Sequence, residues 1–295
     1  MAISNFIPTV WRENLFTQLD NNYIGVKHCT REYEGDIVGM GSVVNVYGLN
    51  NVNVFNYVKG ADINSPQSAV SSTVSQLEIN RAKAFNFLID DVDRVQKDPK
   101  LMDEALRNAA KALAKTADKY IFGIFDSASD INEDFGVKQI SCYNTTAENI
   151  LDHLIDGVTA IYQNDVTNAD DIYIEVSPII AALILKAKVA LGVNDGSALE
   201  TGCIGKINGC KVFVSNNITV SSADEGGYLN RCFIRSGRAI AFAEQLSEIN
   251  AYRPEKRFAD AVKGLHLYGA KVVKPKEIII LDMYTGGSDS AEEEA

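Results

Sequence analysis

The chain has 295 residues, of which 46% are hydrophobic and 23% are charged. This balance is typical of a folded globular protein and excludes a disordered or membrane-embedded chain. The formal net charge of -11 excludes a protein whose whole surface attracts DNA or anionic lipid.

The first segment predicts a short amphipathic arm. Residues 5–22 mix apolar and polar side chains around the single tryptophan, Trp11, and Leu15 and Leu19 follow at the spacing of one helical turn. No basic start followed by a long apolar run precedes this arm, so we expect no signal peptide. No apolar run reaches the roughly 18 residues of a membrane span. We therefore expect a protein of an aqueous, cytoplasmic setting with no membrane partner.

Residues 37–89 predict β-structure. Val, Phe and Tyr concentrate in three runs separated by Gly, Asn, Ser and Pro, and residues 52–57 and 76–80 alternate as neighbours on a strand do. The polar stretch 60–75 between them is one that a compact domain has little reason to bury. We expect an extended β-hairpin that projects from the body of the protein.

Such a hairpin requires a surface to lie on, because two strands alone are marginally stable in water. Val54, Phe55 and Tyr57 are the large apolar side chains of this segment. An exposed apolar ribbon is an aggregation hazard. We therefore expect these three residues to contact a neighbouring subunit, and the hairpin to reach across it.

A long helix is expected from Asp98 and Pro99 to Ile124. Aspartate can cap a helix, and proline is preset for the first helical position. Apolar residues then recur at steps of three and four over about seven turns, while the opposite face carries lysines and an arginine. The pattern predicts the longest helix of the protein, with its apolar stripe packed in a core.

The second half predicts an α/β unit. A capping box at 145–148 would start an amphipathic helix, a strand is expected at 172–176, and Pro178 would open a helix through about Val189. Asn208-Gly209 between apolar flanks predicts a tight hairpin. Further strands are expected at 231–234, 239–243 and 276–281, and an acidic solvated tail at 285–295.

Motifs of catalysis or metal binding are weak. The sequence has no phosphate-binding loop, dinucleotide fingerprint or serine-nucleophile elbow. The five cysteines are odd in number and scattered, so we interpret them as reduced thiols. Lys27-His28-Cys29 places two metal-ligand types together but has no second half, which argues against zinc. We expect no catalytic residues, no metal and no cofactor.

One acidic cluster requires separate consideration. Asp90, Asp91 and Asp93 fall within four residues and could share a cation. No histidine or second acidic cluster accompanies them, so we favour a polar turn or a salt bridge between subunits. An enzyme remains the remote alternative, and a metal bound at these three aspartates would reveal it.

Four segments resemble, in the same order, the major capsid proteins of tailed bacteriophages, and the resemblance covers nearly the whole chain. They are NFIPTVW at 5–11, REYEGDI at 31–37, LEI at 77–79 with KAFNFLIDDVD at 83–93, and IGKINGCKVFVSNNI at 204–218. The resemblance implies an α+β, Hong Kong 97-like capsid fold with an N-arm, an extended E-loop hairpin, a long spine helix, a peripheral domain and an axial domain.

The resemblance also implies boundaries for these parts. They are the N-arm at 1–35, the E-loop hairpin at 36–89, the spine helix and peripheral domain at 90–146, the axial domain at 147–251, the returning peripheral strands at 252–284 and the flexible acidic tail at 285–295. Trp11, on the N-arm, joins the hairpin residues and the three aspartates as an expected subunit contact.

The function implied is structural. The family's subunits assemble into hexamers and pentamers of an icosahedral shell that encloses double-stranded DNA, so we expect a virion protein, assembled in the host cytoplasm, that contacts its genome non-specifically. The arm motif begins within five residues of Met1, so we expect a separate scaffolding protein, with a portal protein and decoration proteins as further partners. A shell protein of an encapsulin-type nanocompartment, which shares the fold, is the alternative.

Overall fold

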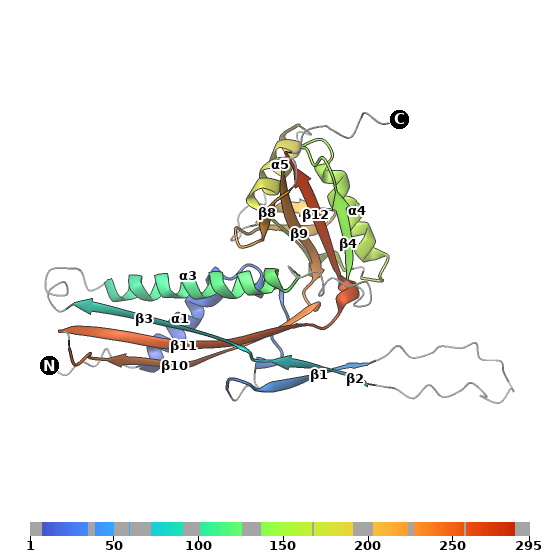
Figure 1. Ribbon diagram of the computed structural model, residues 1–295. Helices are drawn as coiled ribbons and strands as arrows, with labels where there is room; N and C mark the ends of the chain where they lie inside the picture. Colours follow the sequence, from blue (N-terminus) through green and yellow to red (C-terminus); the bar gives the residue numbers. More distant parts are fainter. Residues whose placement is uncertain are drawn as a thin grey trace.

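The computed structural model describes residues 8–34, 39–49, 59, 72–90, 101–125, 137–166, 168–190, 203–223, 227–256 and 258–286. The molecule is extended: an α/β unit stands above a long layer of strands, and helix α3 lies along that layer (Figure 1). In the described part of the chain, no helix is long and apolar enough to cross a membrane.

The upright unit is built on a seven-stranded mixed sheet. Its order is β4-β12-β9-β5-β7-β6, and β8 pairs with β9. The pairs β12–β4 and β5–β7 are parallel, and the other pairs are antiparallel. Its elements are β4 (Lys138–Cys142), α4 (Ile150–Tyr162), β5 (Ile172–Val176), α5 (Pro178–Ala190), β6 (Cys203–Ile207), β7 (Cys210–Val214), β8 (Val220–Ser222), β9 (Tyr228–Ser236) and β12 (Ile278–Thr285), with short 3-10 helices η6 (Ala169–Asp171) and η8 (Pro275–Glu277).

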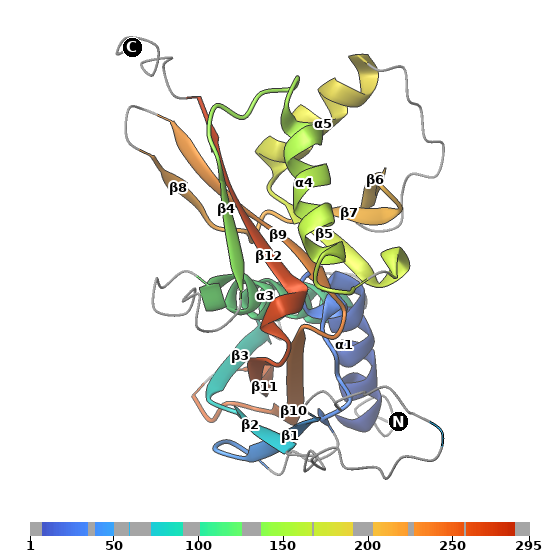
Figure 2. The same cartoon turned by 90° about the vertical axis from the view of Figure 1, so that its right-hand side faces the viewer.

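The two faces of this sheet belong to different cores. Ile234 and Leu281 pack with the buried faces of α4 and α5, which lie beside each other in Figure 2. Their strand neighbours Phe233 and Ile280 point to the opposite face and join the core around α3, as the two-residue period of a strand requires. Helix α4 lies very close to the sheet at Gly157, where an added Cβ would lie 2.6 Å from Ile234 Cδ1. Glycine permits this close approach.

The lower layer is a three-stranded antiparallel sheet of order β10-β11-β3. Buried residues of α1 and α3 share one apolar core with β10, β11 and the near face of the upright unit. Leu106, Ala110, Leu113 and Ala117 form the buried stripe of α3. The elements are α1 (Pro8–Asn22), η1 (Val26–His28), β3 (Arg81–Asp90), α3 (Leu101–Phe122), η3 (Gly123–Phe125), β10 (Ile240–Tyr252) and β11 (Ala259–Val272).

A separate two-stranded ribbon joins this layer at its end. Strands β1 (Val43–Leu49) and β2 (Ser72–Glu78) pair antiparallel, from Val43 opposite Glu78 to Leu49 opposite Ser72. Val44, Val46, Leu77 and Ile79 are buried against Ala241, Ala243 and Leu267 of β10 and β11. The root of the ribbon is therefore anchored on the lower layer, and the strands lead away from it (Figure 1).

Several predictions from the sequence are confirmed. The longest described helix is α3, at the expected place, and β5 and α5 have the expected bounds within one residue. Asn208 and Gly209 have φ values of 49° and 83°, which are the left-handed conformations that a tight hairpin turn between β6 and β7 requires.

The predicted capping box at 145–148 is wrong. Helix α4 begins only at Ile150, and residues 147–149 form a turn. The Thr145 hydroxyl donates to the carbonyl of Cys142 at 3.1 Å, so it does not cap the helix. The Thr146 backbone N–H donates instead to the side chain of Asn149 at 2.8 Å. Local side-chain bonds thus shape a turn before the helix.

The pairing of strands that are far apart in the chain was not predicted from the sequence. Strand β3, expected within the hairpin at 36–89, pairs with β11, which the sequence analysis did not anticipate. Strands β4 and β12 lie in the same sheet as β5 and β9, whereas β10 lies in the lower layer. These groupings depend on pairing between strands that are far apart in the chain. Local sequence patterns do not indicate which strands pair. Residues 287–295 of the expected tail lie outside the described residues.

Candidate functional site

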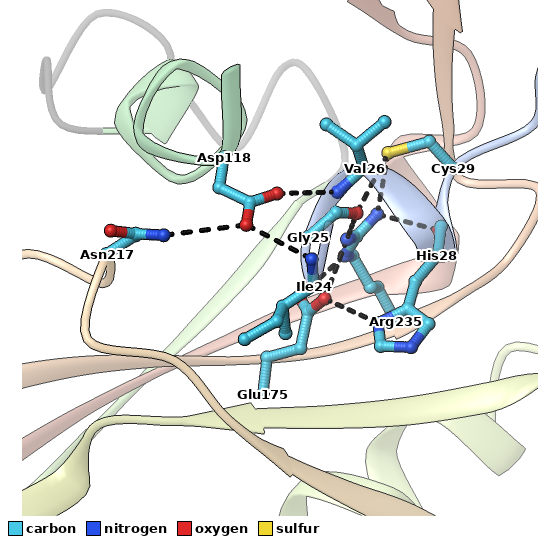
Figure 3. Close-up of polar contacts among 9 residues, drawn as sticks. All are labelled: Ile24, Gly25, Val26, His28, Cys29, Asp118, Glu175, Asn217 and Arg235. Carbon is cyan, nitrogen blue, oxygen red and sulfur yellow. Dashed lines mark hydrogen bonds and ion pairs between the residues drawn. The ribbon is translucent and has the colours of Figure 1, made fainter. Parts of the chain in front are cut away.

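The segment 23–31, which follows α1, lies where the upright unit, α3 and the lower layer meet, and Figure 3 shows the polar contacts of its residues 24–29. The carboxylate of Asp118 on α3 accepts hydrogen bonds from the backbone N–H groups of Ile24 at 3.1 Å and Val26 at 3.0 Å. Asn217 adds a contact at 3.5 Å from the loop before β8. Burial raises the pKa of Asp118 to about 6, although the backbone donors oppose this shift. The contacts fix the segment to α3.

Gly25 allows this segment to approach the helix closely. A Cβ at this position would lie 2.8 Å from Cζ of Phe122, near the C-terminal end of α3. The backbone of Gly25 is in the ordinary right-handed region, with φ of -67°. Its small size, and not its conformational freedom, is therefore what the packing requires.

A buried ion pair lies on the other side of the segment. Arg235 on β9 binds Glu175 on β5 through Nε and Nη2, with both distances 2.8 Å. The guanidinium also donates to the backbone carbonyls of Gly25 at 2.6 Å and His28 at 2.9 Å, and to Cys29 Sγ at 3.3 Å. One arginine thus connects two strands of the upright sheet to the segment that follows α1 (Figure 3).

The electrostatics of this cluster favour a neutral histidine beside a charged pair. Burial alone would raise the pKa of Glu175, but Arg235 and the hydrogen bond with His28 hold it below its ordinary value. Burial lowers the pKa of His28. Nδ1 of His28 lies 2.8 Å from Glu175, and its ring stacks on Tyr173 with centroids 4.1 Å apart. His28 therefore donates to the carboxylate as a neutral ring at pH 7.

A third buried carboxylate, Glu244 on β10, contacts the two ends of the same segment. It accepts hydrogen bonds from the Tyr23 hydroxyl and from Arg31 Nη2, and Nε2 of His266 on β11 lies 2.8 Å away. Burial and the neighbouring Glu244 raise the pKa of Tyr23, so its hydroxyl stays protonated. The lower layer is thereby connected to the start and the end of segment 23–31.

A third polar contact joins α3 directly to the upright sheet. Arg231 on β9 binds Asp282 on β12 with distances of 2.9 and 3.1 Å, and it donates to the backbone carbonyl of Phe125 at 2.6 Å. Phe125 ends the short 3-10 helix that continues α3. Charged groups on β9 thus connect the upright unit both to the end of α3 and to segment 23–31.

This arrangement is suited to mechanical coupling and not to chemistry. Asp118, Glu175 and Arg235 are at most 1% exposed, which leaves no room for a substrate. Burial also raises the pKa of the Cys29 thiol, which keeps it from acting as a nucleophile. Within the described residues, no three His, Cys, Asp or Glu side chains are placed to hold a metal ion.

The residues that the sequence singled out lie elsewhere or outside the described residues. Trp11 is in α1 and Asp90 ends β3, but the side chains of both are outside the described part. The other expected contacts, Val54, Phe55, Tyr57, Asp91 and Asp93, lie wholly outside it.

Sequence reasoning missed the buried cluster. His28 and Cys29 were considered as metal ligands, whereas they contact Glu175 and Arg235. One signal was available: Glu175 and Arg235 each interrupt an apolar strand, between Ile174 and Val176 and after Ile234. A charged residue inside such a run points to a buried partner of opposite charge.

The extended fold and these buried contacts between its parts are typical of a structural protein. Residues 75–281 match the family model described as phage capsid protein, and the chain therefore belongs to that family. Its fold is of the Hong Kong 97 type. It is a major capsid protein, which is a non-enzymatic component of a virion that assembles with copies of itself.

Solved structures share the fold. A chain of Mycobacterium phage Che8 is 26% identical with a TM-score of 0.64, over 88% of this chain and 90% of that one. The capsid of Ralstonia phage GP4 is 10% identical with a TM-score of 0.65, over 92% of both chains. The SrpI encapsulin of Synechococcus elongatus is 10% identical with a TM-score of 0.53, over 83% of this chain and 82% of that one. No curated protein sequence matches the chain significantly.

Proposed function

We propose that copies of this chain form the hexamers and pentamers of an icosahedral shell around a double-stranded DNA genome. The observation that carries the proposal is the ribbon β1–β2. Its root is buried on the lower layer through Val44, Val46, Leu77 and Ile79, and its strands then lead away from the body. A ribbon of this kind requires a second surface, and a shell of identical subunits supplies one at every position.

The parts of the molecule suggest roles in that shell. We assign the N-arm to residues 1–35, the E-loop to the ribbon that begins at β1 and returns at β2, and the spine to α3. The three-stranded sheet then belongs to the peripheral domain and the seven-stranded sheet to the axial domain, which would surround the symmetry axes. Trp11, Val54, Phe55 and Tyr57 are proposed contacts between neighbours, together with the three aspartates 90, 91 and 93.

Further partners follow from the same proposal. A separate scaffolding protein would guide assembly in the host cytoplasm, a portal protein would occupy one vertex, and decoration proteins would bind the outer surface. We also expect the face that lines the shell to be acidic, because the net charge of -11 would repel DNA weakly and let it slide during packaging.

A nanocompartment shell is the second candidate function. The similarity to the SrpI encapsulin supports it at the level of the fold alone. Such a shell would enclose enzymes in place of a genome, so its particles would contain co-purifying protein and no packaged DNA.

Expression of the chain alone, and together with its neighbouring phage genes, distinguishes these functions. Negative-stain images, particle diameters and nuclease-protected DNA would be compared. We expect closed shells of uniform size only with the scaffolding gene, and DNA inside mature particles. Uniform shells from the chain alone would refute the separate scaffold, and enclosed enzyme without DNA would favour the nanocompartment.

A further inference from the structure

A cationic pocket lies at the C-terminal end of α3. Its volume is about 450 Å³, and it is lined by the end of α3, the start of β3, the residue before β4 and the end of β11. Arg81, Lys119 and Lys271 contribute three positive charges, and no carboxylate lines it. Phe125 and Val137, both buried, form an apolar floor. The pocket therefore suits a segment with acidic and apolar side chains.

These charges form no ion pair within the described part of the subunit. The Arg81 guanidinium lies over the Tyr120 ring, 5.1 Å from its centroid, and none of the three cations pairs there with a carboxylate. Lys119 lies in the last turn of α3, where a cation stabilises the helix end. Arg81 and Lys271 come from strands, so helix stabilisation does not explain them. In a chain of net charge -11, their convergence on one hollow indicates an anionic partner.

A complementary segment follows the other end of the same strand. Strand β3 runs from Arg81 to Asp90, so its ends are about 30 Å apart. Asp90 is followed in sequence by Asp91, Val92 and Asp93. The aspartates complement the cations of the pocket, and Val92 complements its apolar floor.

We propose that the pocket receives segment 90–93 of a second copy. Arg81 of the pocket and Asp90, the first residue of the segment, are the two ends of strand β3, so a subunit that gives its segment to one neighbour would receive that of another. Such a head-to-tail contact is heterologous and propagates from copy to copy, which is how rings and shells form. The inference rests on the proposed assembly and specifies one surface that drives it.

Charge reversal and charge exchange test this contact. The variants are Arg81→Glu with Lys271→Glu in the pocket, Asp91→Lys with Asp93→Lys in the segment, and all four together. Lys111→Glu with Lys115→Glu, on the exposed side of α3, is the matched control with the same change in charge. Each chain is expressed with the assembly partners that give wild-type shells, and shells are quantified by sedimentation and microscopy.

We expect each reversal to reduce the shell yield at least about tenfold, because like charges then oppose each other in every contact. The variant that carries all four substitutions should give a shell yield within about threefold of wild type. The control should give the wild-type yield. Thermal melts of the unassembled subunits should stay unchanged. If Arg81→Glu lowers the melting temperature, Lys119→Glu with Lys271→Glu replaces it.

Normal shell yield from the pocket reversal would overturn the inference. The inference would also be overturned if Glu292–Glu294→Lys restored assembly of the pocket variant and the two aspartate substitutions did not. The C-terminal acidic stretch would then be the occupant. A wild-type chain that forms no shells under any condition would refute the proposed assembly and this contact with it.

Discussion

Arg235 and Glu175, on the adjacent strands β9 and β5, bind each other through two hydrogen bonds of 2.8 Å, and their side chains are 1% and 0% exposed. A buried ion pair adds little over an apolar pair of the same shape, but removing one partner leaves an uncompensated charge. This pair also connects segment 23–31 to the upright unit.

Replacing Arg235 with Met should therefore destabilise the subunit by roughly 3–5 kcal/mol. The free energy of unfolding of the unassembled subunit, measured in urea, checks this. The double variant Arg235→Met with Glu175→Leu should recover much of the loss, since no buried charge remains unpaired. If Arg235→Met alone were as stable as wild type, the pair would not hold segment 23–31 to the upright unit.

The elements of this fold could be predicted from the sequence better than their pairing. Local signals were sufficient for α3, β5, α5 and the turn at Asn208-Gly209, because periodicity, proline and left-handed residues act over a few positions. The pairing of β11 with β3 was not predicted, and His28 was considered as half of a metal site. His28 contacts Glu175 and Arg235, which lie 147 and 207 residues away in the chain. A local sequence pattern cannot indicate contacts over such separations.

The pH dependence of stability should report the protonation of Asp118. Burial raises its pKa from 3.8 to about 6 in the folded state. Between these values the folded protein holds a proton that the unfolded chain releases. The contribution of Asp118 to stability should therefore decrease as pH rises from about 4 to 6, by up to about 1.4 kcal/mol per pH unit.

Asp118→Asn isolates this effect, because asparagine has a similar size and does not titrate. Urea unfolding of both proteins would be measured from pH 4 to 7, and the difference between their free energies of unfolding should fall with rising pH and level off above about pH 6. A difference that is constant across this range would show that the carboxyl group is not perturbed.

His28 should produce a pH dependence of the opposite sign. Burial lowers its pKa below the ordinary 6.5, so in mild acid the unfolded chain binds a proton that the folded state does not. Its contribution to stability should be complete above about pH 6.5 and decline as pH falls below that value. His28→Gln keeps a donor for Glu175 without titrating. The advantage of wild type over this variant should shrink below pH 6.5, and an advantage that grows in acid would contradict the neutral histidine.

The final prediction concerns the hairpin that the sequence places at Phe55 and Tyr57, outside the described residues. Replacing both with Ser should weaken each contact between subunits by about 2 kcal/mol per side chain, which is the free energy gained by burying an aromatic ring. Because this loss recurs at every copy, assembly should fail. Thermal stability of the unassembled subunit should change little, since the described core of the ribbon is formed by its root.

Thermal melts of the subunit and sedimentation of assembled particles measure the two effects separately. Asn51→Ser with Asn56→Ser is the matched control, because it changes two residues of the same segment without removing apolar surface, and it should assemble normally. The ribbon acts between subunits only if melting and assembly respond differently to the aromatic substitutions. Unfolding of the Phe55→Ser, Tyr57→Ser subunit would place these rings in its own core, and shells at normal yield would show that they contact no neighbour.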